Sequence, residues 1–409
     1  MIQKNWRSII FTLAILLLIL FELANLLLIG PLGFTQEMEN TAGLAHFLTM
    51  NILYLRILLL GIIGWAAVGI FKKRKLYPKI LIGIALLIYC FIFYMSNFKL
   101  KADKLFQDQN ITITEPVSSN IVPLDEDVIG VSINGQSKAY PLDYLAFHHK
   151  VSDRVGDEPI LVTYCIWCRS GRVFSPIIDG KLESFRLVGM TEYNAIIEDK
   201  TSSTWWQQAT GEAIAGKKKG AKLNEVNSEQ MSLESWIQKH PETQILQPDS
   251  SFIEEYDHNS KFVSRFGKVK ATEYDPWQER SWIIGVANEE EAKAFDYLSL
   301  IENKVMQDSV GNLPVLVVLE PDTVSFHVWD TRVDTLALDF TFDSGSVTMM
   351  DTQTESIWDM TGTCISGNLE GSKLTTVQAY EEYWHSWKTF HPNTEKVREV
   401  KTDSLNLNN

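Results

Sequence analysis

Three long apolar runs open the chain, and shorter alternating runs follow them. Residues 8–30 are almost unbroken Ile, Leu, Phe and Ala, and further apolar runs cover residues 47–71 and 80–98. Each run approaches or exceeds the ~20 residues that cross a bilayer as a helix. A cleaved signal peptide is the alternative for the first run, but that run is too long and no small-x-small cleavage site follows it. The pattern predicts a membrane segment over residues 1–104 with three transmembrane helices.

Basic residues around these runs predict the orientation of the segment. Lys4 and Arg7 precede the first run, and five further Lys or Arg residues lie in residues 72–79, between the second and third runs. Short loops rich in Lys and Arg stay in the cytoplasm. Residues 31–46 carry Glu and no basic residue. We therefore expect a cytoplasmic N-terminus and a C-terminal domain in the periplasm or outside the cell.

Two ionisable residues fall inside the apolar runs. Glu22 belongs to the first run and Arg56 to the second, each in the half predicted to face outside. Pairing would lower the cost of placing both charges in a bilayer. The alternative is that Arg56 extends its long side chain to the interface. Two such residues in three runs do not resemble the broken helices of a transporter.

Charge divides the chain at the end of this segment. Of the 37 Lys and Arg and the 51 Asp and Glu, 26 basic and 47 acidic residues follow residue 104. Such an acidic domain would repel nucleic acid, whose binding relies on basic side chains at the phosphates. We therefore exclude nucleic acid as a partner and expect the lipid bilayer as one. A protein partner is left unspecified.

The sequence of the acidic domain contains an internal repeat. Eleven identities recur at an offset of 155 residues, among them Gly130 with Gly285, and ten more recur at an offset of 151. The repeat predicts a first copy over residues 121–248 and a second, degenerate copy over residues 274–400. Asn134-Gly135 and Asp179-Gly180 are hairpin signals. A segment from Ser232 to His240 has the cap and stop of a helix. The predicted fold is a three-helix transmembrane segment followed by a duplicated, strand-rich α+β extracytoplasmic domain.

The concentrated chemical signal is Cys165-Ile166-Trp167-Cys168, at the end of a predicted buried strand. A thioredoxin-like site would place this motif at a helix start, but an alternating run predicts another strand after it. Covalent haem attachment needs a His after the second Cys, where this chain has Arg169. A four-thiolate zinc site lacks its other two cysteines.

A mixed site of two thiolates and an imidazole suits copper or zinc, and His148 is the candidate imidazole. At an offset of 155 the three candidate ligands correspond to Asn303, Glu320 and Thr323. Their joint absence from the second copy indicates that the scaffold does not need them. The alternative is structural: two buried small residues or an inert disulfide, with His148 as a helix cap. Met190 and Asn194 are candidates to line the same pocket, although Met is more often core filler.

A tryptophan pair, Trp205-Trp206, precedes a glycine-rich tract. Trp358 and the glycines recur in the second copy, so we interpret them as architecture, with Trp206 also a candidate for the pocket lining. Stacking on a sugar ring is the alternative for the pair. Residues 217–219 are three lysines between two of these glycines and are interpreted as a solvated turn.

These motifs together resemble a bacterial family known as domain of unknown function 3179 (DUF3179), over about residues 128–392. The residues that carry the resemblance are Phe147-His148, Thr163-Tyr164-Cys165-x-x-Cys168 and Trp206 followed by Gly211-x-x-Ile214-x-Gly216. The family has Pro-Leu between the cysteines and Gly-Thr after them, where this chain has Ile166-Trp167 and Arg169-Ser170. The resemblance implies a shared fold and a bacterial plasma (inner) membrane, and supplies no activity.

Two functions follow as hypotheses. The first is a membrane-anchored extracytoplasmic metal-binding or thiol-redox module of unknown substrate, with His148, Cys165 and Cys168 as ligands or reactive groups. The second is a non-catalytic module that binds envelope glycans or a protein. The chain has no nucleophile elbow, phosphate loop or His-Glu-x-x-His motif, so the sequence names no reaction.

Overall fold

The structure is a computed structural model, and it describes residues 6–30, 35–36, 38, 41–72, 76–109, 112–257, 277–343 and 345–398. The chain forms two compact units. Unit 1 comprises residues 1–107 and 183–223, and unit 2 comprises residues 108–182 and 224–409.

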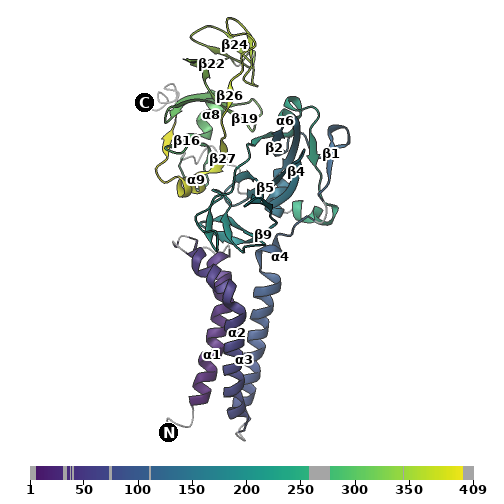
Figure 1. Ribbon diagram of the computed structural model, residues 1–409, viewed down its shortest axis with the longest axis vertical. Coiled ribbons are helices and arrows are strands. Elements are labelled where there is room, and N and C mark those ends of the chain that lie inside the picture. Colours follow the sequence, from purple (N-terminus) through teal and green to yellow (C-terminus); the bar gives the residue numbers. More distant parts are fainter. Residues whose placement is uncertain are drawn as a thin grey trace, which may run out of the picture. The chain divides into compact units, whose positions relative to one another are not determined.

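Three long helices of unit 1 lie side by side (Figure 1) and bury one face of each between them. They are α1 (Trp6–Ile29), α2 (Thr41–Phe71) and α3 (Tyr77–Tyr94), and α3 continues as a π-helical turn, η3 (Met95–Lys99), followed by α4 (Ala102–Leu105). Leu18 of α1, Ile63 of α2 and Ile82 of α3 are buried in this core. All three helices are long and apolar enough to cross a membrane, which confirms the predicted helices. The second begins six residues before the predicted run, at Thr41.

Unit 1 also contains an antiparallel sheet of the order β12-β11-β10-β9. Its strands are β9 (Phe185–Thr191), β10 (Asn194–Asp199), β11 (Trp205–Gln207) and β12 (Ala213–Ala215). One face of the sheet packs on the α1–α2 end, where Trp205 and Ile196 form a cluster with Ile29 and Ala45. The approach is close, because a Cβ atom added at Gly189 would lie 2.3 Å from the carbonyl oxygen of Ile29.

Unit 2 begins with residues 108–182 and 224–257, called here its first half. One sheet has the order β1-β14-β3-β2-β13, and a second joins β4, β5 and β6. Their bounds are β1 (Thr114–Pro116), β2 (Asp127–Ile133), β3 (Gln136–Pro141), β4 (Lys150–Val155), β5 (Glu158–Cys165), β6 (Ser170–Phe174), β13 (Glu229–Ser232) and β14 (Gln244–Leu246). The ribbon β7 (Ile177–Ile178) and β8 (Lys181–Leu182) and the helices α5 (Leu142–His148) and α6 (Leu233–Lys239) complete it.

Local signals in this half are confirmed. The hairpin turns at Asn134-Gly135 and Asp179-Gly180 have positive φ at all four residues, as their sequence requires. The hydroxyl of Ser232 caps α6 by accepting from the N–H of Ser235.

The second half of unit 2, residues 277–398, contains three larger sheets, of the orders β27-β15-β16-β28, β17-β18-β19-β26 and β22-β23-β24-β25. Their strands are β15 (Trp282–Ala287), β16 (Ala292–Asp296), β17 (Val305–Val310), β18 (Leu313–Leu319), β19 (Phe326–Asp330), β22 (Phe340–Asp343), β23 (Thr348–Asp351), β24 (Ile357–Trp358), β25 (Cys364–Ser366), β26 (Thr375–Thr376), β27 (Tyr380–Tyr383) and β28 (Glu395–Val397). The helices α8 (Tyr297–Asn303) and α9 (Trp384–Phe390) and the ribbon β20 (Arg332–Val333) and β21 (Leu336–Ala337) lie between them in the chain.

The two halves of unit 2 share one strand arrangement. Strand β2 pairs antiparallel with β3 and β13, and β3 pairs parallel with β14. In the same way, β15 pairs antiparallel with β16 and β27, and β16 pairs parallel with β28. A buried tryptophan covers a glycine in each sheet: a Cβ added at Gly130 would lie 2.3 Å from the ring of Trp236, and one at Gly285 would lie 2.4 Å from that of Trp387. Both contacts leave room for glycine alone.

We predict that Gly130→Ala lowers the free energy of unfolding by about 1–3 kcal/mol, because the added methyl group must displace the Trp236 ring from a filled core. Gly285→Ala should act alike beneath Trp387. Urea unfolding of the full-length protein in detergent, followed by tryptophan fluorescence, measures the change. Ser132→Ala, at an exposed position of β2, is the matched control. Unchanged stability of both glycine variants would contradict the prediction.

Candidate functional site

The Cys165-x-x-Cys168 motif forms the tight turn between β5 and β6. Strand β5 ends at Cys165 and β6 begins at Ser170. The N–H of Cys168 donates to the carbonyl oxygen of Cys165 at 3.2 Å, and Arg169 takes the left-handed conformation with φ of 55°. The motif therefore joins two strands. A thioredoxin-like site would need it at the start of a helix. Both cysteines are fully buried.

His148 lies two residues before β4, which pairs with the strand that ends at Cys165. It is the last residue of α5, and the following strand, β4, pairs Lys150 with Thr163 of β5. The ladder continues for one bond, because the N–H of Tyr164 donates to the carbonyl oxygen of His149 at 3.0 Å. The ladder ends there, because His148 belongs to α5 and His149 takes the left-handed conformation with φ of 61°.

The imidazole of His148 is buried in an aromatic setting. Its Nε2 atom lies 2.7 Å from the hydroxyl of Tyr256, and the rings of Phe147 and Phe252 meet it edge-on. The C-cap residue of α5 is its neighbour His149, whose N–H donates to the carbonyl oxygen of Leu145. Burial lowers the pKa of His149 to about 4, so its side chain is neutral at pH 7.

The residues that the structure describes contain no group of three or more His, Cys, Asp or Glu side chains arranged to hold a metal ion. His148, Cys165 and Cys168 therefore do not form a ready coordination shell. Any metal bound there would require their side chains to turn toward one another.

The second half of unit 2 holds the cysteine turn in place. The N–H of Tyr383 donates to the carbonyl oxygen of Cys168 at 2.9 Å, and Nε2 of His385 lies 3.0 Å from the carbonyl oxygen of Trp167. Arg169 pairs with Glu381 of β27, and with Asp127 at 2.9 Å. Backbone and side-chain contacts therefore fix the turn from the side of β27.

Two buried arginines dominate the electrostatics next to the turn. The guanidinium of Arg169 lies 3.8 Å from the centre of the Trp282 ring. That of Arg172 pairs with Glu382 and lies 3.5 Å from the centre of the Tyr380 ring. Burial raises the pKa of Glu381, and the charge of Arg169 lowers it by less. Burial likewise raises the pKa of Asp127 against the opposing effect of Arg169. The charge of Arg169 therefore offsets only part of the effect of burial on these two carboxyl groups.

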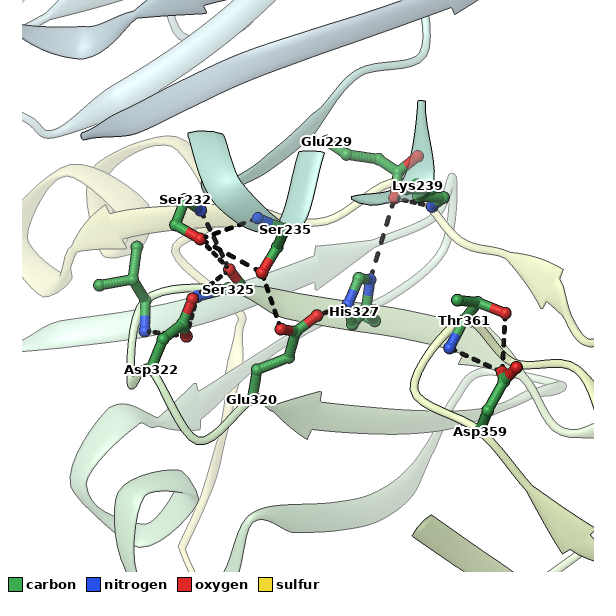
Figure 2. Close-up of polar contacts among 11 residues, drawn as sticks. Glu229, Ser232, Ser235, Lys239, Glu320, Asp322, Ser325, His327, Asp359 and Thr361 are labelled. Carbon is green, nitrogen blue, oxygen red and sulfur yellow. Dashed lines mark hydrogen bonds and ion pairs between the residues drawn. The ribbon is translucent and has the colours of Figure 1, made fainter. Parts of the chain in front are cut away.

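The matching turn of the second half makes a different network with the first half. Figure 2 shows Ser232 and Ser235 facing Glu320, Ser325 and His327. The hydroxyl of Ser235 donates to Oε2 of Glu320 at 2.8 Å, and Nε2 of His327 lies 2.6 Å from Oε1 of the same carboxylate. The N–H of Ser232 donates to the hydroxyl of Ser325 at 3.0 Å. Glu320, at the position that matches Cys165, thus contributes to the contact between the halves.

The remaining candidates for the pocket lining, Met190, Asn194 and Trp206, belong to unit 1 and not to the unit of the cysteines. The side-chain oxygen of Asn194 accepts from Nε2 of Gln207 at 2.7 Å. The indole N–H of Trp206 donates to Asp199 at 3.0 Å. These polar atoms join β10 to β11 and the turns beside them.

The two intramembrane candidates are paired. Arg56 donates to both carboxylate oxygens of Glu22, from Nε and Nη2, each at 2.7 Å. Asn97 accepts from Arg56 and donates to Glu22, and the hydroxyl of Tyr89 lies 3.3 Å from the same carboxylate. The network joins all three long helices, as expected of charges placed in an apolar environment.

Sequence reasoning missed the partners of the candidate residues. The sequence patterns predict no role for Arg169 as the partner of a buried carboxylate, and none for Tyr256 as the partner of His148. One signal was present: Glu381 and Glu382 lie between two tyrosines, in the segment that the structure shows to be strand β27. Adjacent carboxylates in such a strand indicate buried basic partners.

Comparison with known proteins gives one match. The model of the family described as "Protein of unknown function (DUF3179)" matches residues 113–394. Neither the curated proteins nor the solved structures give a match.

We predict that Arg169→Met destabilises the protein by about 3–5 kcal/mol near pH 8, because it leaves buried carboxylates without their partner. Removing the guanidinium should raise the pKa of Glu381 and Asp127 further, so the folded state binds protons more tightly than the unfolded chain. Stability is then lost as the pH rises from the ordinary carboxyl range through the raised pKa. The deficit should therefore be smaller at pH 5 than at pH 8.

Urea unfolding of the full-length protein across this pH range measures the effect. Arg154→Met, at an exposed position of β4, is the control and should change little at any pH. A deficit that does not depend on pH would contradict the proposed electrostatic cause.

Proposed function

The chain belongs to the DUF3179 family, whose description assigns no activity, and we propose that it is a membrane-anchored protein that binds one copper or zinc ion. The proposed ligands are Cys165, Cys168 and His148. The observation that carries the proposal is the complete burial of all three side chains, with both cysteines in the turn that follows β5 and His148 two residues before β4, the strand that pairs with β5.

Burial favours a metal site over thiol exchange. Thiol–disulfide exchange requires that an attacking sulfur reach the thiol, whereas both cysteines have no exposed surface. A closed coordination shell needs no such access, and two thiolates with an imidazole suit copper or zinc. Since the described side chains form no ready shell, the proposal includes their reorientation when the metal binds.

Tyr256 would orient the imidazole. Histidine ligands commonly donate their second ring N–H to a neighbouring oxygen. The hydroxyl of Tyr256 is such an oxygen, 2.7 Å from Nε2 of His148.

We further propose that the two halves of the extramembrane chain arose by duplication. The shared pairing of β2 with β3 and β13 and of β15 with β16 and β27 supports this proposal. The second half has Glu320 at the position of Cys165, where it contacts Ser235 and His327. A metal site in the first half alone is therefore compatible with one scaffold used twice.

We propose that three spans anchor the protein in the bacterial plasma membrane, with its N-terminus in the cytoplasm and the C-terminal domain outside. The length and apolarity of α1, α2 and α3 support the anchoring. The basic residues of 72–79 support the orientation.

We predict that the full-length protein, purified anaerobically in detergent, retains close to one copper or zinc ion per chain. Cys165→Ser and Cys168→Ser should each abolish retention, because a metal held by three ligands does not tolerate the loss of a thiolate. His148→Asn, which introduces the residue of the matching position 303, should weaken it. Metal analysis by mass spectrometry and titration of accessible thiols give the measurements.

Cys364→Ser is the matched control, because Cys364 is a buried thiol of the second half and should not affect retention. The whole chain is used because the sheet of residues 183–223 packs on the helices. If neither copper nor zinc is retained after incubation with each, or if Cys364→Ser loses the metal equally, the proposal is wrong.

Tyr256→Phe tests the orienting contact separately. We predict metal affinity lower by about 10–100-fold, the usual cost of losing a hydrogen bond to a histidine ligand. Competition with a chelator of known affinity measures it. Tyr144→Phe is the control, because the ring of Tyr144 packs against that of Tyr256. Equal affinities of wild type and Tyr256→Phe would remove Tyr256 from the site.

A further inference from the structure

The turn after β12 in unit 1 carries three consecutive lysines, Lys217, Lys218 and Lys219. We propose that this turn binds the phosphate groups of anionic phospholipids at the membrane surface, beside the α1–α2 end. The inference rests on the membrane anchoring proposed above and adds a specific contact with the lipid.

The position of β12 carries the first step. Ala215 of β12 belongs to the apolar cluster that contains Ile29, the last residue of α1, and Ala45 of α2. Lys217 follows Ala215 by two residues, at most about 8 Å along the chain. The headgroup layer on each side of a bilayer is about 5–7 Å deep. A turn this close to a helix end therefore lies within reach of the headgroups.

Polar contacts fix the sheet on the helices. Nε2 of His46 lies 2.8 Å from the carbonyl oxygen of Ser203, and its ring meets Trp205 edge-on. The hydroxyls of Thr41 and Thr191 are 3.2 Å apart. These contacts on strands and turns of one sheet hold β12, and with it the lysine turn, at the helix end.

Lys217 and Lys219 are exposed. Among the described residues, no ion pair includes either of them. The turn itself is closed by the backbone: the N–H of Gly220 donates to the carbonyl oxygen of Ala213 at 2.9 Å. The side chains of Lys217 and Lys219 are thus not needed to form the turn, and their charges are available to a ligand.

The second half of unit 2 contains the same turn with different side chains. There the N–H of Gly371 donates to the carbonyl oxygen of Cys364 at 2.9 Å. The residues between the glycines are Asn368, Leu369 and Glu370. The turn therefore does not require lysine, and a lysine run occurs in the copy whose sheet packs on the apolar helices.

The sheet β9–β12 and the sheet β22–β25 also differ in how far matching residues are exposed. The pairing of Glu198 with Trp205 matches that of Met350 with Ile357. Trp205 is fully buried by the helix end, whereas Ile357 is 37% exposed. The register is common to both sheets, so the helices account for the burial in unit 1. The lysines belong to that membrane-adapted version of the sheet.

The experiment uses the full-length protein in lipid nanodiscs of phosphatidylcholine, with and without phosphatidylglycerol. We predict that the variant Lys217→Gln/Lys219→Gln binds phosphatidylglycerol more weakly by about fivefold for each lysine. Native mass spectrometry of retained lipid and the lipid dependence of the thermal midpoint give the affinity. The variant Lys373→Gln/Lys388→Gln, with the same change of charge in unit 2, should bind as the wild type does.

The outcomes separate this inference from the anchoring on which it rests. A wild-type chain that alkaline carbonate extracts from membranes would overturn the anchoring and the lipid contact together. A chain that resists extraction, but whose lysine variant retains phosphatidylglycerol like the wild type, would overturn the lipid contact alone. Equal protection by inorganic phosphate would identify a site for free phosphate and reject the lipid. If the control variant lost phosphatidylglycerol binding equally, the effect would come from net charge alone and the lysine turn would not be a lipid site.

Discussion

The burial of two guanidinium groups, those of Arg169 and Arg172, is the constraint on which unit 2 depends. A charge removed from water is tolerated only when it is paired and hydrogen-bonded. The partners Glu381 and Glu382 lie 212 and 210 residues further along the chain. Arg169 follows Cys168 directly and Arg172 lies in β6, the next strand, so the cysteine turn reaches its final environment only when β27 has added its carboxylates. The candidate metal site and the contact between the halves are therefore parts of one cooperative structure.

The sheets β9–β12 and β22–β25 can be compared position by position. Contacts that both sheets make are needed by the fold, and differences between them reflect the packing of one sheet on the helices. The indole of Trp206 donates to Asp199, and that of Trp358 donates to Asp351, both at 3.0 Å. Such shared contacts hold the strands together in either setting. On the opposite face the residues diverge, because helices cover one sheet and leave the other exposed. Divergence at matched positions is thus the better indicator of local function.

Sequence patterns predicted the features that depend on neighbours in the chain. The three apolar helices, the hairpin at Asn134-Gly135 and the strand that ends at Cys165 all follow from periodicity and turn chemistry. Tertiary partners could not be predicted in this way. The contact of His148 with Tyr256 spans 108 residues. The packing of residues 183–223 on α1 and α2 depends on complementary shapes that no local pattern encodes. Charged residues such as Arg169 are ordinarily exposed, so their burial was unexpected.

Residues 183–223 belong to the same unit as the helices, although they lie within the first half in the sequence. The matching segment of the second half stays within its own unit, whereas this one belongs to unit 1. The chain consequently passes between the units at residues 107, 182 and 223. The last two crossings follow β8 and precede β13, so the segment is continuous with the strands of the first half. The half that carries Cys165 and Cys168 is therefore the half tied to the apolar helices. The second half, free of that attachment, supplies the carboxylates of β27 that pair with the arginines beside the cysteine turn.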